Sequence, residues 1–205
     1  MIESGSHVPG IDPAKFGLLP HEAMRWEQPH ASLEGLIGDY FIFDSEGPES
    51  VGSVEWMLPN WPVIRFALAE NPMTIEAPDW RWSPLLEAGF YGPTSRVLKH
   101  TSSSGVSMGV SLTPAGVARL FDIDVADYRD RMVPLQSLLP DGCEQLVAEL
   151  RASDQGPAVK FIFDRFFLAR MNRPHPAEPR IMALNRLLLD DAIQTVGDLA
   201  SAVGL

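Results

Sequence analysis

The side chains that could do chemistry are few and scattered along this chain of 205 residues. A metal site on barrel strands needs imidazoles close together, typically a His-x-His pair that converges with a third histidine and a carboxylate. Only His100 lies on a plausible strand, and no two of the histidines have that spacing: they are His7, His21, His30, His100 and His175. The sequence therefore predicts no metal site.

Nucleophilic catalysis also lacks its usual residues. Ser102-Ser103-Ser104-Gly105 is typical of a hydrophilic turn, because it is not part of a Gly-x-Ser-x-Gly elbow and no histidine is spaced to act as its base. The single Cys143 lies on the apolar face of a predicted helix, where a buried and inert thiol is the default. The phosphate-loop patterns Gly-Lys-Ser/Thr and Gly-x-Gly-x-x-Gly are absent. We therefore expect no catalytic residue, no cofactor and no enzyme activity.

Aromatic and polar residues on the predicted strands are better suited to enclosing a small molecule. The aromatic side chains between residues 40 and 91 either fill a core or form the wall of an apolar pocket, and core filling is the simpler interpretation for any one of them. Arg65 is a cation in an otherwise apolar strand, where it could bind an acidic ligand, pair with Glu55 or point to solvent. The candidate ligand-binding residues are Tyr40, Trp56, Arg65, His100 and Met108.

These candidates are positioned by short strand-like runs that predict a small β-barrel. Residues 1–30 hold Pro9, Pro13, Pro20 and Pro29 and are predicted to be irregular. The strand-like runs are separated by Gly, Pro, Asn or Ser clusters and cover residues 37–43, 53–58, 63–69, 73–76, 95–101 and 107–112.

Helical patterns take over after the barrel. Thr113 and Pro114 are typical of an N-cap and a first helical residue. Apolar periodicity then predicts longer helices, with the first two packed as a pair, and the prolines of 172–177 predict a linker before the third. These helices cover residues 141–151, 158–171 and 178–189.

The last residues, 195–205, have the pattern that opens a helix-turn-helix unit. Thr195 can cap a helix whose apolar residues recur at i, i+3, i+4 and i+7. The small Ala200 would let a second helix cross closely, and Gly204 can adopt the positive φ of a tight exit turn. An ordinary surface helix with a glycine C-cap has the same pattern. The expected scaffold residues are Thr195, Leu199, Ala200 and Gly204.

The order of these features resembles the AraC family of bacterial transcription regulators. The resemblance covers residues 33–205 and lies in Gly92-Pro93-Thr94, in the block from Gly109 to Phe121, and in Glu178-Pro179-Arg180-Ile181 running into 195–205. It implies a cupin-like barrel for effector binding or dimerisation, followed by a DNA-binding domain with two helix-turn-helix units. We expect the sequence to hold only the start of that second domain, as a truncated regulator without its reading helices.

The expected fold is therefore α+β: a small cupin-like β-barrel, then a helical pair, then the first helices of a helix-turn-helix domain. The expected parts are an irregular segment (1–30), a sensor barrel (31–135), a helical dimerisation or connector region (136–171), a linker (172–177) and an incomplete helix-turn-helix domain (178–205).

The expected function is ligand sensing, dimerisation or both within an AraC-like regulator. A small-molecule effector would shift the conformational population of a homodimer, and DNA would be bound only through the full-length protein. Two alternatives stay open. One is a cupin-type enzyme, which the missing His-x-His pair disfavours, and the other is a ligand-free dimerisation module in which Phe163, Phe166 and Phe167 would face a twin helix.

Charge and composition agree with these expectations. The net charge of −11 divides into −12 for residues 1–150 and +1 for residues 151–205, so the larger part would be repelled by DNA. No apolar run approaches the roughly 20 residues of a membrane helix, and Met1-Ile2-Glu3-Ser4 does not resemble a secretory signal. With a single cysteine, the chain is expected in the reducing cytoplasm and away from membranes.

Overall fold

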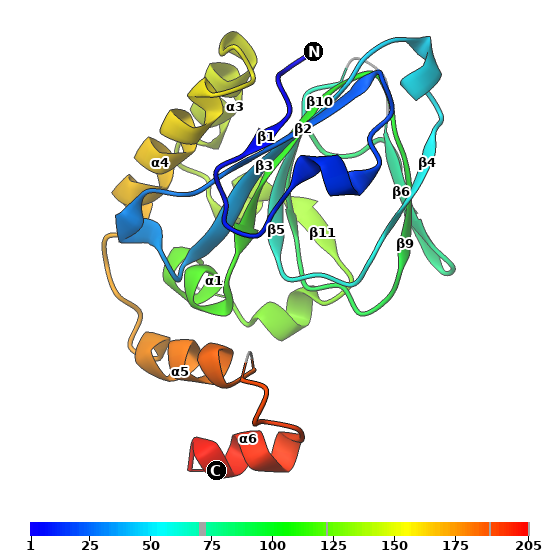
Figure 1. Cartoon of the computed structure of the whole chain (residues 1–205). Coiled ribbons are helices and arrows are strands. Elements are labelled where there is room, and N and C mark those ends of the chain that lie inside the picture. The colour runs from blue at the N-terminus through cyan, green and yellow to red at the C-terminus, as the bar shows by residue number, and fades with distance from the viewer. Residues whose placement is uncertain (70–72, 122, 189, 205) are drawn as a thin grey trace.

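The computed structural model describes residues 1–69, 73–121, 123–188 and 190–204. The chain is mixed α+β, with the strands in its first two thirds and most of its helices after them (Figure 1). The described strands form two sheets. The larger has the order β1-β2-β3-β10-β5-β8-β11, and the smaller has the order β4-β9-β6-β7.

The larger sheet is antiparallel except for the pairing of β1 with β2. Its strands are β1 (Gly5–Ser6), β2 (Glu22–Glu27), β3 (Ile37–Ser45), β5 (Val63–Ala67), β8 (Ala88–Tyr91), β10 (Gly105–Leu112) and β11 (Met132–Pro134). The smaller sheet is antiparallel and consists of β4 (Val54–Met57), β6 (Thr74–Ala77), β7 (Trp80–Trp82) and β9 (Leu98–Thr101). Among the described strands, no hydrogen-bonded pair joins one sheet to the other.

The prediction of an irregular segment over 1–30 is wrong for β1 and β2. β2 pairs along its whole length with β3, from Glu22 opposite Ser45 to Glu27 opposite Tyr40. Pro20 and Pro29 lie just outside β2, where a missing backbone N–H leaves the ladder intact. The prolines therefore mark the ends of a strand. The short strands β7, β8 and β11 were not predicted either.

The described α-helices are α1 (Pro114–Leu120), α2 (Leu135–Leu138), α3 (Cys143–Ala152), α4 (Ala158–Arg170), α5 (Glu178–Leu188) and α6 (Val196–Ala202). All but α2 begin close to the predicted positions, and α2 was not predicted. The Thr113 hydroxyl caps α1 by accepting from the Gly116 N–H at 3.0 Å. Gly116 approaches the Leu36 backbone so closely that a Cβ there would overlap the Leu36 carbonyl oxygen, which fixes α1 against β3.

The main core lies between the larger sheet and the helices α3 and α4 (Figure 1). Phe163 and Phe167 are fully buried in it, and Phe166 is nearly so. Their rings pack on one another and on Tyr40 and Phe66 of the sheet. These phenylalanines therefore cover the chain's own sheet, which contradicts the expectation that they face a twin helix.

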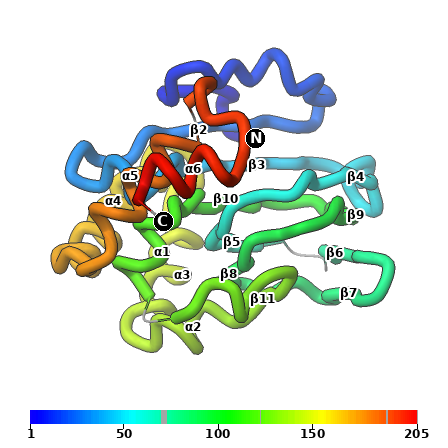
Figure 2. Tube along the Cα trace, turned by 90° about the horizontal axis from the view of Figure 1, so that it is seen from below, coloured from blue at the N-terminus to red at the C-terminus, as the bar shows by residue number. Residues whose placement is uncertain are grey.

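The last two helices lie beside one end of the sheets (Figures 1 and 2). α5 packs on α1, and α6 packs on α5. The segment between α4 and α5 contains no helix, as its prolines predicted. A helix long and apolar enough to cross a membrane does not occur in the part of the chain that the structure describes.

Candidate functional site

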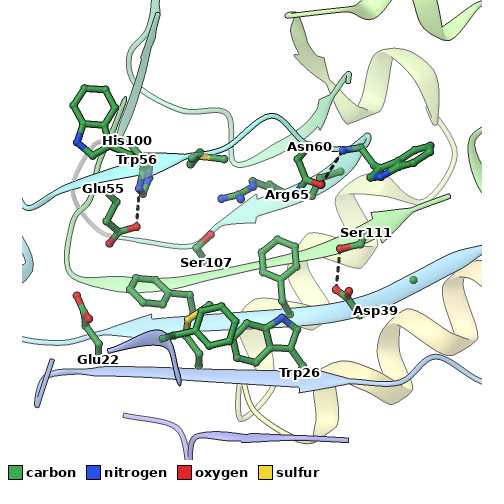
Figure 3. Close-up of a pocket in the computed structure, with 18 of the residues that line it drawn as sticks. Glu22, Trp26, Asp39, Glu55, Trp56, Asn60, Arg65, His100, Ser107 and Ser111 are labelled. Carbon is green, nitrogen blue, oxygen red and sulfur yellow. Dashed lines mark hydrogen bonds and ion pairs between the residues drawn. The ribbon is translucent and has the colours of Figure 1, made fainter. Parts of the chain in front are cut away.

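A cavity of about 1010 Å³ lies between the two sheets. One wall is the face of the larger sheet that points away from α3 and α4, with side chains from β2, β3, β5 and β10. The opposite wall comes from β4 and β9 of the smaller sheet (Figure 3). Thr113 and Pro114 at the start of α1 and Asn185 of α5 also line the cavity.

Arg65 lies near the middle of this wall because a row of cross-strand neighbours leaves room for it. In register across the larger sheet, Trp26 faces Phe41, Phe41 faces Gly109, Gly109 faces Arg65, and Arg65 faces Gly89. A Cβ at Gly109 would overlap the Phe41 ring, and a Cβ at Gly89 would lie 3.0 Å from the Tyr91 ring. The two glycines therefore let both rings lie beside the Arg65 side chain.

The Arg65 guanidinium lies beside two aromatic rings and pairs with no carboxylate of the described residues. Its Cζ lies 5.2 Å from the Phe41 ring centroid and 5.7 Å from that of Tyr91, within the range of cation–π attraction. The Nε atom is buried and lacks a hydrogen-bond partner, and Arg65 forms no ion pair among the described residues. Burial lowers the pKa of this guanidinium, and the nearby Tyr91 and Glu55 oppose that shift. Since an arginine side chain is not deprotonated in proteins near neutral pH, the group stays charged.

Two further polar groups lie to either side of Arg65 (Figure 3). On the smaller sheet, Glu55 faces His100 across β4 and β9, and Glu55 Oε2 lies 3.5 Å from His100 Nδ1. On the larger sheet, Ser111 donates a hydrogen bond of 2.8 Å to Asp39 Oδ1. Burial raises the pKa of Asp39, and the hydrogen bond from Ser111 acts in the opposite direction. The cavity thus holds Arg65 between Asp39 and Glu55, and Glu22 is a third acidic residue in its lining.

Large apolar side chains surround the mouth of the cavity. Five large apolar residues of the lining are exposed, and Trp56 leaves about two thirds of its surface in contact with solvent. The others of this kind are Phe16, Leu19, Val54 and Trp61. A ligand that enters from this side meets an apolar rim before it reaches Arg65.

Three of the five predicted ligand residues line the cavity, and two do not. Trp56, Arg65 and His100 are in its wall, whereas Tyr40 and Met108 lie fully buried on the other face of the sheet. The reason is the alternation of side chains along a strand, since Phe41 and Ser107, one position away, face the cavity. Tyr40 instead donates a hydrogen bond of 3.0 Å to Asp164 of α4.

Several lining residues were missed by sequence reasoning: Trp26, Asp39, Phe41, Ser107, Ser111 and Asn185. Four of them lie on β3 or β10 at alternate positions, Asp39 with Phe41 and Ser107 with Ser111. Because alternate side chains of a strand point to the same face, one cavity-facing residue in each strand would have predicted the other. Trp26 was hidden in the segment that was predicted to be irregular. Asn185 comes from α5, and no local pattern relates that helix to the sheets.

The predicted helix-turn-helix scaffold has the expected local geometry. The Thr195 hydroxyl accepts from the Asp198 N–H at 3.1 Å, and the Asp198 carboxylate accepts from the Thr195 N–H at 2.9 Å, which is a complete capping box. Leu199 and Ala200 are half-buried, and Gly204 has a φ of 73°. The helix start and the left-handed exit are thereby confirmed, and a role in DNA binding stays a prediction.

Within residues 1–69, 73–121, 123–188 and 190–204, His100 has no hydrogen bond to a serine, threonine or cysteine that it could activate. In the same ranges, no three His, Cys, Asp or Glu residues are grouped to hold a metal ion.

Comparison with known proteins gave no matching family model, no matching curated protein and no matching solved structure.

Proposed function

We propose that this chain is the ligand-sensing part of an AraC-like transcription regulator, with the two sheets arranged as a cupin-like sensor that binds a small organic molecule. The observation that carries the proposal is the composition of the cavity wall. Sheet residues such as Arg65 share this wall with Thr113 and Pro114 of the α1 cap and with Asn185 of α5. An occupant would therefore touch both the sheets and the helices that lead to the predicted DNA reader.

The contact between α1 and α5 offers a route for the signal. Arg119 of α1 donates through Nε to Glu178 Oε2 at 2.7 Å, and its Nη2 bonds the other oxygen of the same carboxylate. A third bond, from Nη1 to the Met171 carbonyl at 3.1 Å, reaches the end of α4. Arg119 thus joins the helix that begins at the cavity to the first residue of α5.

The proposed mechanism is a shift between populations. A ligand that contacts Asn185 and the α1 cap binds more tightly when α5 is docked on α1 than when it is displaced. The difference in affinity between the two states sets how far the ligand can move α5 and α6. The assignment to the AraC class rests in addition on the sequence resemblance of residues 109–121 and 178–205. Because of that resemblance, the proposal also includes homodimerisation, and DNA binding by the full-length protein.

Hydrogen exchange tests the sensor proposal directly. Small molecules that raise the thermal midpoint of the chain are selected first, since a ligand specific for the folded state stabilises it by mass action. We expect such a ligand to slow amide exchange in α5 (Glu178–Leu188) and to leave α3 (Cys143–Ala152), beyond the opposite face of the sheet, unchanged.

The Asn185→Ala variant supplies the control for coupling. It keeps the sheet wall, so binding should fall only modestly, while the protection of α5 by the ligand should largely disappear. A ligand that occupies the cavity of the unaltered protein without changing exchange anywhere in α5 would contradict the sensor function.

A further inference from the structure

Arg65 is a cation enclosed between two sheets, without an anion in contact with it. Buried polar groups in folded proteins nearly always have a hydrogen-bond partner, and each exception calls for an explanation. Here the Nε atom has none among the described residues, although the guanidinium faces a cavity of about 1010 Å³. An arginine with a purely structural role would be expected to pair with a carboxylate. Glu55 is close enough to favour the charged form of Arg65, yet its carboxylate lies beside His100 instead.

The surroundings of Arg65 hold the guanidinium in place and leave donors unused. The faces of Phe41 and Tyr91 lie beside it, and these rings can attract the cation without accepting its N–H groups in conventional hydrogen bonds. Gly109 and Gly89 on the flanking strands leave room for these two rings beside the side chain. Because the planar guanidinium presents its donors as a rigid fork, it matches the two oxygens of a carboxylate.

The acidic residues in the same cavity limit the charge of the ligand. Glu55 and Asp39 lie to either side of Arg65, and Glu22 also lines the cavity, so a second negative charge on the ligand would be repelled by the carboxylates around it. The remaining wall near Arg65 is largely aromatic, with Trp26, Phe41 and Phe43 on the larger sheet. A singly charged acid with an apolar body satisfies both conditions.

We propose that the cavity binds an organic monocarboxylate, whose carboxylate accepts hydrogen bonds from Arg65 and whose apolar body lies against Trp26, Phe41 and Phe43. The inference rests on the proposed function only for the presence of a small-molecule ligand. The wall of the cavity supplies the chemical class.

The test is titration of the purified chain with probes matched in shape and different in charge. A series of carboxylates (acetate, phenylacetate, 3-phenylpropionate and indole-3-acetate) is compared with 3-phenylpropionamide, 3-phenylpropylammonium and inorganic phosphate by calorimetry. We expect at least one aromatic carboxylate to bind roughly tenfold or more tightly than the neutral amide, as charge-assisted hydrogen bonds predict, and phosphate to bind no better than acetate.

Two variants show whether Arg65 is responsible. Arg65→Met should abolish the preference for carboxylate over amide, and Arg81→Met, which removes an exposed arginine of β7 from outside the cavity, should keep it. Arg65→Met should also keep or raise the thermal midpoint, since it removes a charge that lacks a partner. A midpoint that falls by several degrees would assign Arg65 a structural role instead. Arg65→Lys keeps the charge without the fork and should bind the carboxylate with intermediate affinity.

Four results would overturn the inference: equal binding of amide and carboxylate, tighter binding of the ammonium, carboxylate preference that survives Arg65→Met, or no binding by any carboxylate of the series. Failure here is distinguishable from failure of the sensor proposal. Arg65-dependent carboxylate binding without any change in α5 exchange would leave the ligand class standing and reject the sensor. Protection of α5 by a ligand whose binding does not depend on Arg65 would support the sensor and reject the proposed ligand class.

Discussion

The two faces of the larger sheet are built from the same strands and differ in almost every physical respect. The face toward α3 and α4 is closely packed, with residues such as Tyr40, Ile64 and Met108 fully buried. The face toward the smaller sheet carries Asp39 and Arg65 around an open cavity. Neighbouring residues of one strand thus have different surroundings, since one face packs into the core and the other lines a cavity. Substitutions one position apart should therefore have different, and in places opposite, effects.

The largest effect is expected on the packed face, at Phe163. Its fully buried ring lies 5.1 Å from that of Tyr40 and 5.5 Å from that of Phe66, so Phe163→Ala should lower the free energy of unfolding by about 3–5 kcal/mol. The matched control is Phe161→Ala on the same helix, where the ring is 68% exposed and the loss should stay within about 0.5 kcal/mol. Urea denaturation measures both. Equal losses at the two positions would show that α4 is not packed on the sheet as described.

The next effect separates two buried tyrosines by their hydroxyl groups. The Tyr40 hydroxyl donates to Asp164, which also accepts from Lys160 at 2.7 Å, so Tyr40→Phe should cost about 1–2 kcal/mol. The Tyr91 hydroxyl is buried without a partner among the described residues, so Tyr91→Phe should be neutral or stabilising. Thermal unfolding of the two variants compares them directly. The prediction fails if removing the Tyr91 hydroxyl is the more damaging change.

Tyr40 also shows how far the sequence leads. The start of α1 at Thr113-Pro114 and that of α6 at Thr195 were predictable, because capping depends on residues within one helical turn. Arg65 was identified as well, because a cation in an apolar strand is unusual whichever face it occupies. The choice of Tyr40 and Met108 was wrong because an aromatic or apolar residue fits either face, and only the pairing of strands decides between them.

The remaining features of the site depend on contacts between distant segments. Phe41, Gly109 and Arg65 become neighbours only when β3, β10 and β5 pair in one register, and no local pattern specifies that register. β2 was missed because the prolines near its ends were interpreted as breaking the whole segment. Asn185 reaches the cavity from the far end of the chain, so its position depends on the docking of α5 on α1.

A smaller effect tests whether the two faces communicate. Arg119 contacts Met171 at the end of α4, on the packed face, and Glu178 of α5, the helix whose Asn185 lines the cavity. The hydrogen bonds from Arg119 hold the pKa of Glu178 below its ordinary value of 4.5. A lowered pKa in the folded state means that the pair stabilises the docked helix above pH 4.5 and loses this effect as the pH falls through the lowered value.

Glu178→Gln should therefore speed amide exchange in α5 at neutral pH. In the unaltered chain the protection of α5 should fall as the pH is lowered and Glu178 is protonated, and the variant should lose most of this dependence on pH. The two side chains are only 15% and 11% exposed, but glutamine keeps an oxygen that can accept from Arg119, so we expect a local loss of only about 1 kcal/mol and little change in global unfolding. The control is Glu149→Gln, which removes an ion pair of α3 with Arg165 of α4 and should leave α5 unaffected. Unchanged α5 exchange in Glu178→Gln would show that this pair does not hold the helix.

The smallest effect is expected at Asp39, next to Tyr40 on the opposite face. Burial raises the pKa of Asp39 above its ordinary value of 3.8, which means that folding favours the protonated acid. Ionisation therefore opposes folding, and the loss of stability grows as the pH rises through the raised value. Asp39→Asn cannot ionise and still offers an oxygen to the Ser111 hydroxyl, so it should be more stable than the unaltered chain at neutral pH and similar to it below pH 3.8.

Thermal midpoints measured between pH 3 and pH 8 check this profile, with Asp127→Asn at an exposed position as the control for a general change of charge. If Asp39→Asn were less stable at neutral pH, the carboxylate would have a stabilising partner on the cavity face. The cavity face would then be optimised for stability in the same way as the packed face. The predicted gain would instead mean that the Asp39 carboxylate, like the Arg65 guanidinium, lowers the stability of the fold, a pattern that is typical of binding sites.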